Sequence, residues 1–384
     1  MPLRLPRLPP INHKVAAIAA LGVLGLASFG AIQVFGDPGA AGPRRVVSLS
    51  PGDAAAETTP SISLADAMGG EEMSVFDLSE LPTYDSEVGE ISSDGELRVA
   101  VVETPEAAAA RAPVRPLPRA PIAALTERGP NGPLPIVAPD GRTPAQAYAR
   151  PFTRDPNKPM VAIVIGGLGF NARATQQAID ELPAAVTLSF VPYAADLQTW
   201  IDRARARGHE VLLELPMEPF DPDADDTGPQ ALLSTASAQQ NVTRLELLLS
   251  RGAGYFGVTN YQGARFATSA SASQPIVQAL RRRGLVFISS GIGQRTALSV
   301  EAGRTGLANT AADRIIDARR EAEAIDEQLL NLEALALQNQ SAIGAGFAYP
   351  VTMEQVNRWA RDIESRGYQL APASAVLSAR AQRR

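Results

Sequence analysis

The chain contains no cysteine and only two histidines, His13 and His209, among its 384 residues. The missing cysteines exclude disulfides, thiolate metal sites, a cysteine nucleophile and lipidation at cysteine. The two histidines leave little material for a site that needs several imidazole ligands. The formal net charge is −6 and no basic stripe is present, which argues against a nucleic-acid-binding protein.

An apolar run near the N-terminus, 15–36, has Gln33 as its only strongly polar side chain. About 20 apolar residues suffice to cross the core of a bilayer, and the basic residues in 1–14 predict a cytoplasmic tail before the span. A cleaved signal peptide is the alternative interpretation, although the run is long for a signal core and no clear Ala-x-Ala site follows it. Both interpretations place the rest of the chain outside the cytoplasm. The first predicts a single-pass inner-membrane protein that is mostly periplasmic.

Composition divides the remainder into a long linker and a folded domain. Proline, alanine and serine dominate 37–133, and acidic residues greatly outnumber basic ones between 53 and 106. Such a stretch repels itself and buries little apolar surface, so a disordered linker is predicted. Residues 134–158 are richer in apolar and aromatic side chains and are expected to pack on the edge of a domain spanning 159–377. A short tail, 378–384, follows.

Short apolar runs within 159–377 have the composition of strands that are buried on both faces. They are MVAIVI, VTLSFV, EVLLEL, GYFGVTN, LVFIS and SAIGAG. Segments with helical spacing alternate with them, and one carries a capping-box pattern from Thr352 to Gln355. Four helices are expected to end in Arg–Gly, at 207–208, 251–252, 283–284 and 366–367, a pair that suits a helix C-terminus. Repeated helix–Arg–Gly–strand units predict an α/β fold with parallel strands, and about seven strands favour a barrel.

In a β/α barrel the functional side chains lie at the carboxyl ends of the strands. The first predicted strand, within VAIVIGGLGF, ends in Gly166 and Gly167 and not in ionisable side chains. Strand ends further along the chain carry no dinucleotide-binding glycine pattern, no phosphate-binding loop and no nucleophile elbow. The strand ends therefore exclude these common types of site.

Several blocks together resemble a known family in their order and spacing. They are VAIVIGGLGF, VTLSFVPYA, GHEVLLELPMEPFD, VTNYQGARF, GLVFISS and GAGFAYP. They resemble the divergent polysaccharide deacetylases, a periplasmic branch of the NodB-like deacetylases, over roughly residues 134–377. The resemblance implies a deformed (β/α)7 barrel. In metal-dependent relatives it implies a divalent ion, held by acidic and histidine side chains, that activates water to remove an acetyl group from a sugar.

The sequence departs from the family pattern at the positions that carry this chemistry. The resemblance implies two aspartates, a histidine, an aspartate and a histidine at positions that hold Gly166, Gly167, Tyr261, Ser289 and Phe347. These positions are interpreted as vestigial. The one histidine of the domain, His209, is expected at the opposite end of its strand, in a structural role. No metal site and no cofactor are therefore predicted.

Carboxylates offer only weak substitutes for the lost groups. Glu214 stands at a position often held by histidine in the family, whereas Glu218, Asn260 and Arg265 match the family. Glu214 and Glu218 are weak catalytic candidates as an acid/base pair for glycoside cleavage, although Glu214 is equally able to pair with Arg265.

An acidic run follows these two glutamates. Its alternating aspartates, from Asp221, hint at a calcium loop, but Asp226 and Leu232 replace the glycine and glutamate that such a loop needs. A solvated acidic loop is the simpler interpretation.

The predicted function is that of a membrane-anchored pseudoenzyme of carbohydrate or cell-envelope metabolism, which binds a glycan such as peptidoglycan, or an envelope protein. Whether it is an enzyme stays open, with the lost site residues favouring no activity. The predicted ligand-binding residues are Tyr193, Glu214, Asn260, Tyr261, Arg265 and Tyr349, because aromatic faces and polar groups suit a sugar-binding groove. The same aromatic rings could instead fill a vacated pocket. An active carbohydrate deacetylase or hydrolase is one alternative. An envelope assembly role, carried by the tether and an apolar helix near 313–338, is another.

Overall fold

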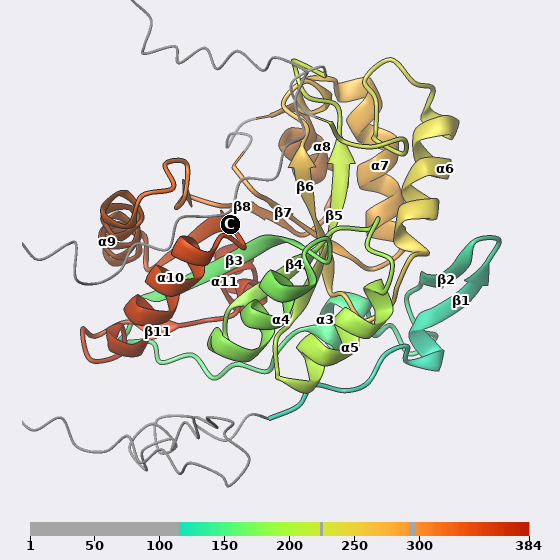
Figure 1. Cartoon of the computed structure of the whole chain (residues 1–384). Helices are drawn as coiled ribbons and strands as arrows, with labels where there is room; N and C mark the ends of the chain where they lie inside the picture. The colour runs from blue at the N-terminus through green and yellow to red at the C-terminus, as the bar shows by residue number, and fades with distance from the viewer. Residues whose placement is uncertain (1–114, 223–225, 292–295, 384) are drawn as a thin grey trace, which may run out of the picture. The chain divides into compact units, whose positions relative to one another are not determined.

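The computed structural model describes residues 115–222, 226–291 and 296–383 (Figure 1). Nine strands form one parallel sheet in the order β8-β7-β6-β5-β4-β3-β10-β9, with β11 also paired to β3. The strands of this sheet are β3 (Met160–Leu168), β4 (Thr187–Phe190), β5 (Val211–Met217), β6 (Gly257–Gln262), β7 (Val286–Ser289), β8 (Asn309–Ala311), β9 (Arg314–Ile315), β10 (Ser341–Phe347) and β11 (Gln369–Leu370). The six strands expected from apolar runs correspond to β3 to β7 and β10.

The sheet is strongly curled, and one stretch of chain joins its two edges. Within 309–315, β8 pairs with β7, and β9 pairs with β10. The backbone between these two short strands continues the pairing, because Ala312 N donates to Ser289 O at 2.7 Å and Asp313 N donates to Ile343 O at 2.7 Å. The sheet is thus a parallel half-barrel whose carboxyl strand ends converge on one rim.

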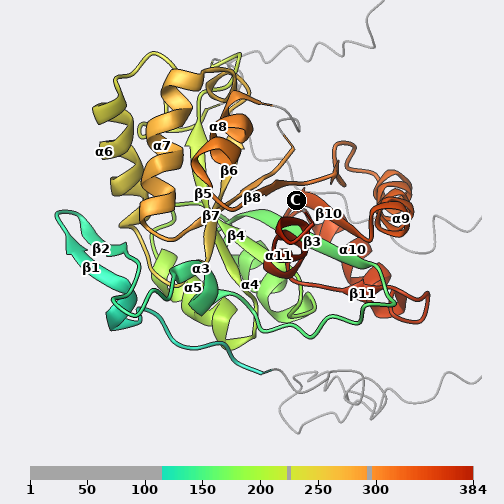
Figure 2. The same ribbon diagram turned by 180° about the vertical axis from the view of Figure 1, so that it is seen from behind.

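Helices cover the outside of the sheet, as the α/β interpretation requires. They are α4 (Ala172–Glu181), α5 (Leu197–Ala206), α6 (Ala238–Leu249), α7 (Ala270–Arg282), α8 (Ala297–Thr305), α9 (Ala322–Asn339) and α10 (Pro350–Asp362), whereas α11 (Ala373–Ala381) packs on the inner side. Figures 1 and 2 show α6, α7 and α8 together at one end of the sheet, and α9 with α10 at the other. Three of the four predicted Arg–Gly ends have glycine at positive φ, whereas Gly252 packs against Ile201 without it.

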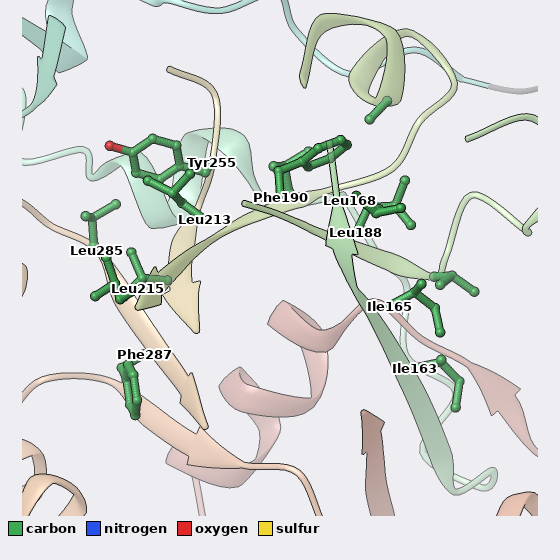
Figure 3. Packing of buried hydrophobic residues seen from close by; sticks show 14 of the residues in the cluster. Ile163, Ile165, Leu168, Leu188, Phe190, Leu213, Leu215, Tyr255, Leu285 and Phe287 are labelled. Atoms are coloured by element: carbon green, nitrogen blue, oxygen red, sulfur yellow. The ribbon is translucent and has the colours of Figure 1, made fainter. Parts of the chain in front are cut away.

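Alternate residues of β3 belong to two separate hydrophobic cores. On β3, Ile163 and Ile165 belong to the larger core under the surrounding helices (Figure 3). Ala162 and Val164, which point the other way, join a smaller core inside the curl. Helix α11 contributes Val376 and other apolar side chains to this inner core. A strand that is buried on both faces has no polar alternation, which explains the continuous apolar runs.

Two local predictions were wrong. The expected capping box at Thr352 does not form, because α10 already begins at Pro350, and the Thr352 hydroxyl instead donates to Asp317 at 3.0 Å. The apolar helix expected near 313–338 begins only at Ala322, since 314–315 is the strand β9. Ile316 therefore follows a strand, and its side chain lies in the larger of the two cores.

The predicted linker ends earlier than expected. Residues 115–133, assigned to the linker, include η2 (Ala123–Leu125), β1 (Thr126–Gly129) and the start of β2 (Gly132–Pro135), and Leu125 is fully buried. Arg205 holds this N-terminal segment against the domain, because its buried guanidinium donates to Pro118 O at 3.0 Å and to Gly254 O at 2.8 Å. The segment 134–158, for which packing on the domain edge was predicted, includes α3 (Pro144–Tyr148), and Tyr148 is buried under Arg205. The predicted tail also contributes to structure, since α11 extends to Ala381.

Glu210, at the N-terminal end of β5, joins three parts of the chain. One carboxylate oxygen accepts from the Thr187 hydroxyl and from Ser374 N, and the other accepts from Arg150 N and the Ser374 hydroxyl. Burial raises the pKa of Glu210, and these four donors oppose that rise. The carboxylate therefore links β4, α11 and the N-terminal segment.

Glu210→Gln is expected to lower the free energy of unfolding by about 2 kcal/mol, because either amide orientation points an NH₂ group at a backbone N–H. Urea unfolding of the full-length protein in detergent checks this, with fluorescence of Trp200 and Trp359, the two tryptophans of the chain. The matched control is Glu127→Gln, which loses a half-exposed ion pair with Arg283 and should change stability by less than about 1 kcal/mol. Equal effects of the two substitutions would contradict the prediction.

Among the helices in the described part of the chain, none is long and apolar enough to cross a membrane. The predicted span, 15–36, and most of the predicted linker lie outside the described residues.

Candidate functional site

Two cavities adjoin each other at the rim formed by the carboxyl strand ends. The larger, of about 1190 Å³, is called the outer groove, and the smaller, of about 510 Å³, the inner chamber. Both are lined by Glu214, Tyr261, Gln262 and Phe347. The outer groove is further lined by Gly167, Phe170, Asn171, Arg173, Ala174, Gln177, Val191, Tyr193, Pro216, Asp226, Thr227, Gly228, Arg320, Ala348, Tyr349 and Pro350. The inner chamber is further lined by Val164, Gly166, Ser189, Thr259, Asn260, Ala264, Ser290, Gly291, Ile315, Ala345 and Gly346.

Glu214 occupies the space into which a side chain at position 166 would extend. A Cβ atom built on Gly166 would lie 2.8 Å from Glu214 Oε1, closer than real Cβ contacts allow. The same oxygen accepts hydrogen bonds from Gly167 N at 2.7 Å and from the Ser189 hydroxyl at 3.0 Å. Glu214 thus reaches across β4 to the end of β3. The carboxyl that the family pattern leads one to expect on residue 166 is supplied instead from β5.

Gly167 is required for a different reason. Its φ of +73° lies in the left-handed region, and a Cβ atom there would lie 3.1 Å from the ring of Phe347. An aspartate would be strained by the backbone and crowded by the aromatic ring. The two glycines that end β3 therefore accommodate two side chains from other strands, Glu214 and Phe347.

The second oxygen of Glu214 is buried and has no hydrogen-bond partner among the described residues. Burial raises the pKa of Glu214 to about 7, and the hydrogen bonds from Gly167 and Ser189 partly oppose this. Thr259, directly opposite on β6, also has a buried hydroxyl that lacks a partner there. Leaving buried polar atoms without hydrogen bonds costs free energy. A polar ligand group at the junction of the two cavities would therefore gain hydrogen bonds to these atoms.

Asp317, which the sequence analysis missed, holds the β10 end of the rim in place. Its Oδ2 accepts from Phe347 N at 2.6 Å and from the Thr352 hydroxyl at 3.0 Å. Burial raises the pKa of this carboxyl, while the hydrogen bond from Phe347 acts against the rise. Asp317 follows a two-residue strand with no apolar run to mark it, so the sequence carried no signal for it. It fixes the backbone that presents Phe347 and, two residues on, Tyr349.

Asn260 braces the rim and does not offer a free amide. Its Nδ2 donates to Gln262 O at 2.8 Å, and its Oδ1 accepts from Ser290 N at 2.9 Å. Ser290 and not Ser289 lines the inner chamber, so the position interpreted as vestigial at Ser289 lies outside both cavities. The carboxamide of Asn260 is therefore already occupied within the protein.

Glu218 and Arg265 pair with each other, so the pairing of Glu214 with Arg265, which the sequence left open, does not form. Arg265 Nε lies 3.4 Å from Glu218 Oε1, and Glu218 Oε2 accepts from Ser234 N at 2.6 Å. Neither residue lines the outer groove or the inner chamber. The predicted acid/base pair of Glu214 and Glu218 is therefore not assembled in one cavity.

Tyr193 lines the wall of the outer groove. Its hydroxyl donates to Thr227 O at 3.3 Å and accepts from Gln230 N at 3.1 Å. Burial raises its pKa. Tyr193, Tyr261 and Tyr349 all line the outer groove, as do Phe170 and Phe347, so the predicted aromatic residues are brought together.

The donor set of the rim does not fit the metal ion of the family's metal-dependent members. Within 115–222, 226–291 and 296–383, no group of three His, Asp or Glu side chains is placed to hold an ion. His209 lies at the far end of β5, where its ring nitrogens face Val186 O at 2.8 Å and Ile179 O at 3.2 Å, and burial lowers its pKa. The acidic run that hinted at calcium lies partly outside the described residues.

Sequence and structure comparisons place this fold and rim in a known family. The family model for "Divergent polysaccharide deacetylase" matches residues 163–377. The chain therefore belongs to the divergent polysaccharide deacetylase family.

Three relatives illustrate the match. A crystal structure of an uncharacterized Agrobacterium tumefaciens C58 protein, ATU2773, is 35% identical with a TM-score of 0.62, covering 64% of this chain and 99% of that one. The Escherichia coli K12 protein "Uncharacterized protein YibQ" is 25% identical over 57% of this chain and 66% of its own length. A Haemophilus influenzae protein is 22% identical over 53% of this chain and 71% of its own.

Proposed function

We propose that this chain is a glycan-binding member of its family that does not carry out metal-dependent deacetylation. The observation that carries the proposal is the exchange at the rim, where the carboxyl of Glu214 fills the space of a side chain on Gly166. This exchange removes the family's acid from β3 and leaves the groove above it intact. The basic tail and apolar run at the N-terminus support a periplasmic domain anchored in the inner membrane. The curled sheet supports the family's deformed (β/α)7 barrel as its architecture.

The dimensions and lining of the outer groove support a sugar polymer as the ligand. Its volume of about 1190 Å³ exceeds the roughly 300–1,000 Å³ of ordinary small-molecule pockets. Tyr193 and Tyr349, together with Phe347, present aromatic rings along it. Aromatic rings pack well against the apolar faces of sugar rings while hydroxyls keep polar partners. A groove of this kind suits several sugar units in a row.

The test is binding of chitohexaose and of soluble peptidoglycan fragments to the full-length protein in detergent, followed by isothermal titration calorimetry. Tyr193→Ala and Tyr349→Ala are each expected to weaken binding by about fivefold, as loss of one stacking contact implies. Tyr368→Ala, outside both cavities, is the matched control and should leave binding unchanged. Absence of binding to any glycan by the wild-type protein would refute the proposal.

An active hydrolase is the second candidate, and the raised pKa of Glu214 together with its unpartnered oxygen favours it. A carboxyl that titrates near neutral pH is suited to donating and accepting protons. The same protein, treated with EDTA, is to be incubated with acetylated chitooligosaccharides while released acetate is measured. We expect no acetate. Release that Glu214→Gln abolishes would establish this second function in place of the first.

A further inference from the structure

Two arginines line the outer groove and form no ion pair with another residue in the described part of the chain. Arg173 lies in the first turn of α4, and Arg320 lies in the loop before α9. Neither forms an ion pair or a hydrogen bond with any other described residue, and both are exposed. Other exposed arginines of the domain do form ion pairs, such as Arg207 with Asp180 and Arg358 with Asp326.

Arg320 is held in a defined orientation. Its guanidinium carbon lies 4.0 Å from the centroid of the Tyr349 ring, in a cation–π contact. Stacking occupies the flat face of the guanidinium and leaves its edge, which carries the N–H donors, available for a carboxylate or phosphate. Because the ring already restricts the side chain, less entropy is lost when an anion binds. Tyr349 is in turn positioned by the backbone that Asp317 holds.

Among the described residues that line the groove, the two arginines face one exposed carboxylate, Asp226, whose Oδ1 accepts from Gly228 N at 2.8 Å. Glu214 is buried, and its Oε1 accepts from Gly167 N and the Ser189 hydroxyl. Asp317, which lies outside the groove lining, interacts electrostatically with Arg320. The N-terminal ends of α4 and α10 also lie at this groove and add partial positive charge. The described lining therefore carries more positive than negative exposed groups.

We propose that the outer groove binds a glycan whose sugars carry carboxylate or phosphate groups. Arg173 and Arg320 bind these anions, and the tyrosines stack on the sugar rings between them. This inference rests on the proposed function and specifies its ligand class. A neutral glycan would leave both guanidinium groups without a partner and would gain only the stacking.

The experiment compares four probes by titration calorimetry against the full-length protein in detergent, at 50 mM and 500 mM NaCl. The probes are hexagalacturonate for carboxylate, a phosphorylated dextran oligosaccharide for phosphate, cellohexaose as a neutral glycan and polyglutamate as an acidic peptide. We expect at least one anionic glycan to bind about tenfold more tightly than cellohexaose at low salt, and to lose most of that advantage at high salt. The stronger of the two anionic glycans identifies the anion.

Arginine variants test which positive charges bind the anionic glycan. Arg173→Gln and Arg320→Gln are each expected to weaken binding of the anionic glycan by about fivefold, with little change for cellohexaose. Arg361→Gln is the matched control, because Arg361 is exposed near the other end of α10 and lines neither cavity.

Equal binding of anionic and neutral glycans, unaffected by the arginine variants, would overturn the inference while the proposed function stands. Tight binding of polyglutamate without either anionic glycan, or failure of all four probes, would overturn the inference. The proposed function is decided separately by the titrations with chitohexaose and peptidoglycan fragments.

Discussion

Gly166→Asp is expected to lower the free energy of unfolding by about 4 kcal/mol, because it forces a second carboxyl into space that Glu214 already fills. The Cβ atom alone would lie 2.8 Å from Glu214 Oε1. Glu214 is only 3% exposed, and its Oε1 is held by Gly167 N and the Ser189 hydroxyl, so displacing it breaks both hydrogen bonds. Two carboxyls at this distance would also repel each other whenever both are ionised.

The decisive measurement is a double-mutant cycle with Glu214→Ala. In the wild-type background Glu214→Ala is expected to destabilise the protein by about 2 kcal/mol, because it leaves a cavity and an unpaired backbone N–H. In the Gly166→Asp background the same substitution is expected to stabilise the protein, since it vacates the space that the new aspartate needs. This reversal of sign is the signature of two residues competing for one place.

Urea unfolding of the four proteins of the cycle gives the coupling energy. Gly303→Asp is the matched control, because a Cβ atom on Gly303 meets nothing within 4 Å. It should lower the free energy of unfolding by less than about 1 kcal/mol. Additive effects of the two substitutions would show that Glu214 does not stand in for a side chain at 166.

Local sequence patterns were sufficient to predict the repeated strand and helix units of the fold. Apolar runs located β3 to β7 and β10, because strands covered on both faces are mostly apolar and show no regular polar alternation. The segment 309–315 was missed because β8 and β9 are three and two residues long, too short to show a period. The residue that follows them, Asp317, was missed for the same reason.

The contacts that make up the rim could not be inferred in the same way. The sequence showed Gly166 and Glu214 separately as departures from the family pattern. Position 166 lacks the expected acid, and Glu214 is an acid at a position often held by histidine. Their strands are not neighbours, since β4 lies between β3 and β5. No spacing along the chain indicates that a side chain crosses a strand. The grouping of aromatic residues was predictable because they lie at or just beyond the carboxyl ends of strands, whereas the pairing of Glu218 with Arg265 depended on loop geometry.

Glu214→Gln is expected to make the protein more stable at pH 7.5 and to leave its stability nearly unchanged at pH 4.5. Burial raises the pKa of Glu214 from 4.5 to about 7 in the folded protein. Between these values the folded state keeps the proton while the unfolded chain loses it, so the unfolded state binds fewer protons and wild-type stability falls as pH rises. Above about pH 7 both states are ionised and the loss remains, at about 3 kcal/mol in total.

Glutamine imitates the protonated acid, because its Oε1 can still accept from Gly167 N and from the Ser189 hydroxyl, and it cannot ionise. The difference in unfolding free energy between Glu214→Gln and the wild type should therefore grow from near zero at pH 4.5 to about 3 kcal/mol at pH 7.5. Urea unfolding of the full-length protein, followed by circular dichroism across this range, measures it. Glu333→Gln removes the charge that pairs with Arg366, while its amide oxygen can still accept from Trp359, and is expected to be less stable than the wild type at pH 7.5. A constant difference between Glu214→Gln and the wild type at all pH values would mean that the carboxyl on the groove floor is ionised throughout, and would remove the basis for assigning it a proton near neutral pH.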